Sequence, residues 1–394
     1  PACGSGHILV TAFEWLFRMY REQFYSAENA VKSILTHNLY GLEIDDRAMQ
    51  LSRFALLLKA ALMLNESAPR AARELINDPG EMLPKIYAFP ENRSFISEEI
   101  GTLTDGKHVA EIGKAFDLLR EGKNLGSVIK LNLSDNVQQT LQSSYDKWQN
   151  KTREGTADLI EQEIWNRLKE YFEVAITLSK KYSAVAANPP YMGQKSMNGE
   201  LKEYINTHYP MTKSDLFAVF MEVCLNLNSK TGLMGMINQH SWMFLSSYEN
   251  YRKYLLKNNN IQSMLHLGPR TFEELSGEVV QSTAFVLENR HDEDAKGNYY
   301  RLVDYKSNRE KEENFLIGNH FYTNIPQSNF EKIPGSPIAY WLSKSIISSF
   351  SKHKTLFQYS ISDGKNVTGN NEKFLRMLWE VDKNNIGQNN HWRI

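Results

Sequence analysis

Short apolar runs that alternate with helical segments most constrain the fold of this 394-residue chain. The glycine turn PACGSG (1–6) leads into a helical pattern over 7–21. The run NLYGLEID (38–45) then reads as a strand that ends in acids, and Asp45 is placed to cap a further helix over 47–64. A turn, a helix, a strand and a second helix in this order predict an α/β crossover.

The same alternation returns in the second half of the chain. The runs YSAVAAN (182–188) and LMGMIN (233–238) read as strands, separated by a helix over 214–228 that Gly232 is predicted to stop. Further predicted elements are a helix after the N-cap Ser26, a strand within KIYAFPEN (85–92), a long helix with an apolar face from Leu159 to Ala175, a helix start at 212–215, a helix at 248–257, and strands near 263–268 and 282–289. The fold class predicted from these elements is α/β.

A change of pattern inside the chain predicts its domain organisation. Residues 65–181 are mostly polar and helical, which indicates a helical insertion into the α/β domain. The insertion separates a first half, 1–64, from a second half, 182–305. Beyond Lys306 the chain becomes charged and irregular, so 306–394 is predicted to be a linker and the start of another module.

Composition argues against several classes of protein. The formal net charge is -1, so no overall field indicates a nucleic-acid or membrane partner, and any anion-binding surface must be local. The two cysteines, Cys3 and Cys224, exclude a disulfide framework and a Cys-based zinc site, and they favour a reducing, cytoplasmic setting. No apolar run approaches the roughly 20 residues that span a bilayer. Because the sequence begins at Pro1 inside a glycine turn, we expect an upstream strand to lie outside it.

The glycine turn and Glu43 together favour a nucleoside ligand. Glycines let a ligand approach the backbone and aim the following helix N-terminus at its polar groups. An acid at the end of a neighbouring strand can accept hydrogen bonds from both ribose hydroxyls. The 37 positions between Gly6 and Glu43 exceed the spacing of about 20 in the dinucleotide fingerprint, which argues against NAD. Ile44 is placed to pack against a flat ring. The alternatives are an ordinary strand-to-helix loop and a solvated strand end.

The tetrapeptide Asn188-Pro189-Pro190-Tyr191 ends the predicted strand at 182–188 and is expected by chance in roughly one chain in a thousand of this length. An amine conjugated to an aromatic ring is a poor nucleophile because its lone pair is delocalised. The Asn188 amide oxygen and the Pro189 carbonyl can accept its two N–H groups and draw the nitrogen toward tetrahedral geometry. Pro190 stiffens the loop and offers no competing donor, and Tyr191 offers a ring face for stacking. The pattern predicts amine alkylation by positioning and electrostatics, without a metal; a proline-rich loop is the alternative.

These motifs resemble those of S-adenosylmethionine-dependent DNA methyltransferases that act on N6 of adenine. PACGSG is similar to the family's cofactor loop, Glu43 to its ribose-binding acid, and residues 188–191 to its catalytic tetrapeptide. The resemblance implies a Rossmann-like methyltransferase sheet, S-adenosylmethionine as cofactor, and an adenine flipped out of double-stranded DNA as substrate. The implied catalytic residues are Asn188, Pro189, Pro190 and Tyr191, and the implied cofactor-binding residues are Pro1, Ala2, Cys3, Gly4, Gly6, Glu43 and Ile44. Phe272 is a candidate contact to the flipped base, with a core phenylalanine as the alternative.

A narrower resemblance is to the large adenine methyltransferases of BREX phage-defence systems (the PglX type) and, next to them, the fused type IIG restriction-modification enzymes. It is carried by the combination of PACGSGHILV, YGLEIDDRAMQLSRFAL, ANPPYMG, GEVVQSTAFVLEN and GNNEKFLRMLWEV. The resemblance implies that 306–394 begins a target-recognition region, that other phage-defence proteins are candidate partners, and that no membrane is involved. For the cofactor's adenine ring, Glu91 and Asn92 are candidate contacts, with a plain loop as the alternative.

Two rival functions stay open at this point. One is a methyltransferase that acts on another planar amide or amine, such as a glutamine side chain in a protein, through the same tetrapeptide. The other is a catalytically inactive DNA-binding scaffold in phage defence, against which the intact residues 188–191 argue.

Overall fold

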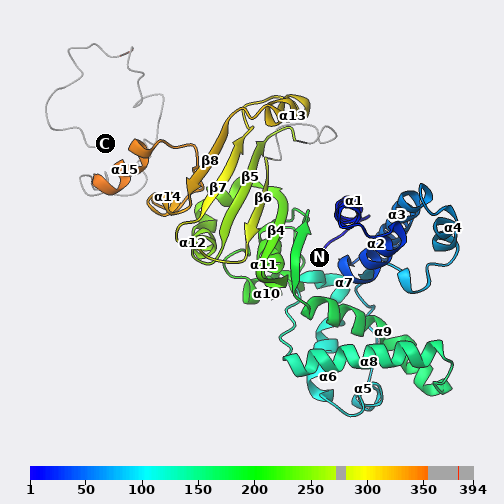
Figure 1. The fold of residues 1–394 in the computed structure, drawn as a ribbon. Coiled ribbons are helices and arrows are strands. Elements are labelled where there is room, and N and C mark those ends of the chain that lie inside the picture. The colour runs from blue at the N-terminus through cyan, green and yellow to red at the C-terminus, as the bar shows by residue number, and fades with distance from the viewer. Residues whose placement is uncertain (272–280, 354–379, 381–394) are drawn as a thin grey trace. The chain divides into compact units, whose positions relative to one another are not determined.

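The computed structural model describes residues 1–271, 281–353 and 380 (Figure 1). Pro1–Ser343 form one compact unit, and a second unit begins at Lys344 with the helix α15 (Lys344–Lys352). The α/β fold predicted from the sequence is confirmed. None of the helices in the described ranges combines the length and apolarity needed to cross a bilayer.

The first elements follow the prediction closely. They are α1 (His7–Glu22), α2 (Ala27–Ser33), the short π-helix η1 (Ile34–Asn38), β1 (Tyr40–Glu43) and α3 (Asp46–Asn65). Asp45 caps α3 as expected, because its Oδ1 accepts hydrogen bonds from the backbone N–H groups of Arg47 (2.7 Å) and Ala48 (3.0 Å). The same hydrogen bonds lower the pKa of the Asp45 carboxyl.

The region predicted as a helical insertion is mainly helical. Its elements are α4 (Pro69–Asn77), η2 (Gly80–Met82), β2 (Lys85–Ala88), α5 (Ser97–Thr104), α6 (Val109–Leu119), α7 (Gly122–Leu125), η3 (Gly126–Val128), α8 (Asp135–Arg153) and α9 (Leu159–Ser179). The apolar face of α9 begins later than predicted, since Leu159 and Ile160 are exposed whereas Trp165 and Leu168 are buried. The buried face packs against α5, α6 and α8, which gives this region an aromatic core.

The second half of the compact unit is built on a six-stranded sheet. Its elements are β3 (Tyr182–Ala187), α10 (Gly199–His208), α11 (Leu216–Leu227), β4 (Asn228–Gln239), η4 (His240–Met243), η5 (Ser246–Tyr248), α12 (Glu249–Asn258), β5 (Asn260–Gly268), β6 (Ser282–Glu288), β7 (Lys296–Arg301), α13 (Asn308–Leu316), β8 (Phe321–Pro326) and α14 (Ser328–Glu331). The strand order is β3-β4-β6-β5-β7-β8, parallel for β3–β4 and β5–β7 and antiparallel elsewhere. The almost wholly buried helix α11 packs against β3 and β4.

The predicted helix stop at Gly232 is wrong. Helix α11 ends at Leu227 because Asn228 is extended (φ -70°, ψ 145°), and β4 begins there without a loop. Gly232 lies within β4, where a Cβ atom would come within 3.0 Å of the carbonyl oxygens of Ser229 and Tyr182. The glycine therefore permits a close approach between β4 and β3 rather than ending a helix.

A second, two-stranded sheet is formed by β1 and β2, which pair in parallel with Tyr40 opposite Lys85. A cavity of about 540 Å³ lies beside both β1 and β3, and its lining includes Cys3 and the α1 residue Leu9. The upstream strand expected from the sequence stays a prediction. The domain borders at 64, 181 and 305 also stay predictions; the sheet itself continues past Lys306 through β8.

Candidate functional site

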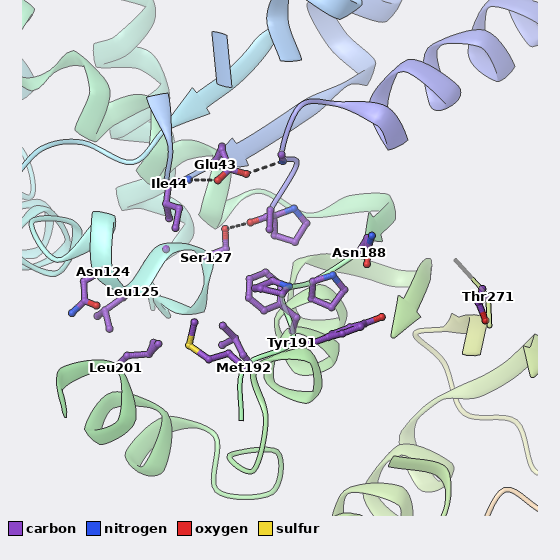
Figure 2. Close-up of a pocket in the computed structure, with 18 of the residues that line it drawn as sticks. Glu43, Ile44, Asn124, Leu125, Ser127, Asn188, Tyr191, Met192, Leu201 and Thr271 are labelled. Carbon is purple, nitrogen blue, oxygen red and sulfur yellow. Dashed lines mark hydrogen bonds between the residues drawn. The ribbon is translucent and has the colours of Figure 1, made fainter. Parts of the chain in front are cut away.

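The segments singled out in the sequence meet at one cavity of about 960 Å³ (Figure 2). The predicted site residues that line it are Pro1, Ala2, Gly4, Glu43, Ile44, Asn188, Pro189, Pro190 and Tyr191. They come from the turn before α1 and from the carboxyl ends of β1 and β3. In α/β sheets this edge is where ligands bind.

The glycine turn presents its backbone to the cavity at Gly4. Gly4 has φ 54°, and a Cβ atom there would meet nothing within 4 Å, so the main chain is open on that side. Gly6 (φ 89°) does not line the cavity; it lets the turn approach Ser52 of α3, with which a Cβ atom would collide. Cys3 does not line the cavity either, and burial raises the pKa of its thiol to about 11. Their predicted roles as cofactor contacts stay predictions.

The Glu43 carboxylate joins the glycine turn to the end of β1. Its Oε2 accepts a hydrogen bond from the backbone N–H of Gly4 (2.7 Å). Its Oε1 accepts from the N–H groups of Ile44 (2.9 Å) and Asp45 (3.3 Å). Because a carboxylate offers about four acceptor positions, capacity remains for a ligand hydroxyl. Ile44, the next residue, is 46% exposed and lines the cavity.

The loop that carries Asn188 is held by Asp215. Asn188 is exposed where β3 ends, and Pro189 is buried. The backbone N–H of Met192 donates to Asp215 Oδ1 (3.1 Å), and Asp215 also caps α11 by accepting from Phe217 N (3.3 Å). This confirms the helix start predicted at 212–215 and adds a second role for its aspartate. Burial raises the pKa of the Asp215 carboxyl.

Tyr191 is half-buried, and its ring meets that of Phe217 edge to face, with centroids 6.0 Å apart. Burial raises the pKa of the Tyr191 phenol, so the ring stays neutral at physiological pH. A neutral aromatic ring in the cavity wall suits stacking against another flat ring.

The cavity also has a wall that sequence reasoning missed, formed by Asn124–Ser127 in the region predicted as a helical insertion. Ser127 Oγ donates a hydrogen bond to the carbonyl of Pro1. Glu91 and Asn92, the candidates proposed from the sequence, do not line the cavity. They lie against cations of the insertion instead: Glu91 is 3.7 Å from Lys123 Nζ, and Asn92 accepts from Arg120 Nε (2.9 Å). No motif marks the 124–127 segment, because its link to the site is purely tertiary.

Two further predictions fall on residues that lie wholly or mostly outside the described ranges. Phe272 lies outside them, although its neighbour Thr271 lines the cavity. The segment GNNEKFLRMLWEV (369–381) lies outside them except for Glu380. Within the described ranges, no group of three or more His, Cys, Asp or Glu side chains is placed to hold a metal ion.

Comparison with known proteins finds a matching family and two similar proteins. Residues 37–272 match the model of the Eco57I restriction-modification methylase family. The chain is 37% identical over 399 residues to "Adenine-specific methyltransferase BrxX" of Escherichia coli O9:H4 (strain HS), which covers 98% of this chain and 33% of that protein. It is 38% identical over 408 residues to "Adenine-specific methyltransferase PglX" of Lacticaseibacillus casei (strain Zhang), with coverages of 97% and 31%. The chain thus spans about one third of the length of these relatives.

A solved structure shares the fold. The ATP-dependent Type ISP restriction-modification enzyme LlaBIII bound to DNA is similar with a TM-score of 0.52 and 13% sequence identity. The similarity covers 93% of this chain and 21% of that one. At this level of identity the likeness concerns the fold alone.

Proposed function

The chain belongs to the Eco57I restriction-modification methylase family, and from this premise we propose that it is the catalytic part of a site-specific DNA methyltransferase that modifies N6 of adenine. One observation carries the proposal: a single cavity brings the glycine turn and Glu43 together with residues 188–191. Both curated relatives are named adenine-specific methyltransferases. Since the chain spans about a third of them, the proposal concerns the full-length protein that contains it.

The proposed methyl donor is S-adenosylmethionine, and the residues present fit it. The open backbone at Gly4 suits the amino-acid end of the cofactor, the spare acceptor capacity of Glu43 suits the ribose hydroxyls, and Ile44 suits the adenine ring. When bound, S-adenosylmethionine supplies a methyl group activated by a positively charged sulfur.

The chain's own residues would prepare the acceptor amine. The amide oxygen of Asn188 and the carbonyl of Pro189 accept its two N–H groups, which frees the nitrogen lone pair from the ring. Pro190 has no N–H that would compete for these acceptors. The neutral ring of Tyr191 holds the flipped base by stacking. Positioning and electrostatic pre-organisation then supply the rate enhancement.

The proposed substrate is double-stranded DNA, and the proposed setting is phage defence or restriction-modification in the cytoplasm, where cellular DNA lies. Nearly all of this chain matches about one third of the proteins named BrxX and PglX, which supports the BREX type identified by resemblance. Other proteins of such a system are candidate partners. No feature of the described residues favours a protein glutamine substrate or an inactive scaffold over this proposal.

Label transfer tests the proposal. The full-length protein is given DNA and S-adenosylmethionine labelled in its methyl group, beside the variants Asn188→Ala and Asn258→Ala; Asn258 is an exposed asparagine that ends α12. We expect Asn188→Ala to lower the transfer rate about 100- to 1000-fold, as for loss of one pre-organised polar contact, and Asn258→Ala to leave it unchanged. Equal transfer by all three proteins would overturn the mechanism. Transfer to a glutamine-containing protein but not to DNA would support the first rival, and cofactor and DNA binding without transfer would support the second.

A further inference from the structure

We infer that the segment Asn124–Ser127 forms the second wall of the pocket for the cofactor's adenine ring, and that the preceding residue, Lys123, positions this wall against Ile44. The inference rests on the proposed function, because it takes S-adenosylmethionine as the ligand of the cavity. It assigns a cofactor role to part of the region predicted as a helical insertion.

The two ends of the cavity fix the direction in which the ligand lies. In Figure 2, Asn188 is on one side of the cavity, and Ile44, Asn124 and Leu125 are on the other. The transferable methyl group must reach an amine held at Asn188. The sulfur that carries this methyl group joins the amino-acid part of the cofactor, proposed at Gly4, to the adenosine part, whose ribose is proposed at Glu43. The purine therefore lies beyond Glu43, toward Ile44 and Leu125.

A flat ring buries its apolar surface fully only between two walls. Ile44 supplies one aliphatic surface and is 46% exposed. Leu125 supplies a second, and it is nearly buried, with 8% exposure, so its position is fixed by packing. Both residues line the same cavity. Apolar contact from both sides is the usual way in which proteins hold a cofactor ring.

Lys123 ties this second wall to the loops that follow β1 and β2. Its Nζ donates hydrogen bonds to the carbonyl of Ile44 (3.0 Å) and to Asp46 Oδ2 (2.7 Å), and it lies 3.7 Å from Glu91 Oε1. An ammonium group has three donors; two of them make these hydrogen bonds, and Glu91 at 3.7 Å adds an ion pair. A surface ion pair alone contributes little to stability, but the hydrogen bond to the main chain of Ile44 also sets where that residue lies.

The other residues of the segment contact Ile44, the glycine turn and the start of α10. Gly126 has φ 58°, and a Cβ atom there would lie 2.9 Å from Ile44 Cγ2, so only glycine lets the two approach. Ser127 binds the carbonyl of Pro1 in the glycine turn. Asn124 donates to Glu200 Oε2 (2.7 Å) and accepts from Asn198 Nδ2 (2.6 Å) at the start of α10. The segment thus connects the cofactor turn, the end of β1 and α10.

Calorimetric binding of S-adenosylhomocysteine and of adenosine to the full-length protein tests the inference. The variants are Lys123→Met, Lys123→Arg and the control Lys114→Met, which changes an exposed lysine of α6 outside the cavity. We expect Lys123→Met to weaken both ligands about tenfold, the loss of one charged hydrogen bond, and Lys123→Arg to recover most of it. With S-adenosylmethionine and DNA, Lys123→Met should raise KM by a similar factor and leave kcat within about twofold, because the wall binds the cofactor equally before and during the reaction.

The outcomes separate this inference from the proposed function. If the unaltered protein binds neither ligand, the proposed function fails. If it binds both, and Lys123→Met binds them equally well or loses kcat without a change in KM, the wall is refuted while the function stands. Gly126→Ala is the second variant, in case Lys123→Met does not fold. We expect it to weaken adenosine and leave DNA binding intact, and unchanged adenosine binding would refute the wall.

Discussion

Glu43 joins two segments of the cavity wall through one carboxylate. It accepts hydrogen bonds from three backbone N–H groups, which join the glycine turn to the end of β1. We expect Glu43→Gln to weaken S-adenosylhomocysteine about 10- to 100-fold in the full-length protein, because the amide has one acceptor oxygen and cannot serve both the backbone and the ribose. Calorimetry measures the change, with Glu66→Gln, an exposed residue at the end of α3, as the control. Unchanged affinity in Glu43→Gln would remove Glu43 from the cofactor site.

Tyr191 is expected to act through its ring and not through its hydroxyl. The phenol pKa is raised by burial, so no phenolate is available near neutral pH. We therefore expect Tyr191→Phe to keep kcat within about threefold, and Tyr191→Ala to lose about 10- to 100-fold, the worth of one base stacked on an aromatic ring. Label transfer to DNA measures both. A Tyr191→Phe variant as impaired as Tyr191→Ala would show that the hydroxyl matters and that stacking is not the main role.

Helix α11 and the loop that carries Asn188 share one anchor, Asp215. It caps the helix and accepts a hydrogen bond from Met192 N in the loop. We expect Asp215→Ala to lower the free energy of unfolding by about 1–2 kcal/mol and to reduce kcat at least about tenfold, because the loop loses its attachment. Ser26→Ala, which removes the cap of α2, serves as control and should lose stability without losing kcat. If kcat falls no further in Asp215→Ala than in Ser26→Ala, the loop does not depend on this anchor.

Three polar rings in contact, those of His240, His266 and Tyr340, connect the ends of β4 and β5 to the segment before Ser343. His240 Nδ1 lies 2.7 Å from His266 Nε2, and His266 Nδ1 lies 3.2 Å from the Tyr340 hydroxyl. Burial, then the nearby His240, Arg301 and Lys311, lower the pKa of His266 from 6.5 to about 3. At a pH between about 3 and 6.5, His266 binds a proton in the unfolded chain but not in the folded chain. The free energy of unfolding therefore falls as the pH falls below 6.5.

Denaturant unfolding between pH 7.5 and pH 5 tests this dependence, a window that stays above the ordinary pKa range of carboxyl groups. We expect a loss that approaches about 1.4 kcal/mol per pH unit from His266 once the pH is well below 6.5. His266→Gln should flatten the profile, whereas His291→Gln, at an exposed site, should not. A profile with the same slope in His266→Gln as in the unaltered protein would assign the effect elsewhere.

Across the whole chain, features encoded locally were predictable and those that depend on distant contacts were not. The capping role of Asp45 and the turn before α1 follow from a few neighbouring residues, so the sequence was enough for them. The 124–127 wall was missed because its hydrogen bonds join residues that are 126 and 76 positions apart. The helix stop predicted at Gly232 was wrong because glycine is common both after helices and where two strands approach closely. Only the position of the Tyr182 carbonyl, a tertiary contact, distinguishes the two.

The last prediction concerns the chain as a unit. Its formal net charge of -1 gives no field that would hold DNA, and it spans about a third of its curated relatives. Phosphate contacts supply most of the affinity for DNA, and base-edge contacts supply sequence specificity. We therefore expect residues 1–394 alone to methylate DNA at least about 100-fold more slowly than the full-length protein at physiological salt.

Label transfer at two salt concentrations, with full-length Asn188→Ala as the blank, shows what the isolated chain lacks. If low salt restores methylation without sequence preference, phosphate contact is what the rest of the protein supplies, because electrostatic affinity rises as salt falls. If low salt restores nothing while S-adenosylhomocysteine still binds, the rest of the protein is needed to flip or orient the base. Sequence-specific methylation by residues 1–394 at the full-length rate would contradict the prediction, since base-edge readout would then have to lie within these residues.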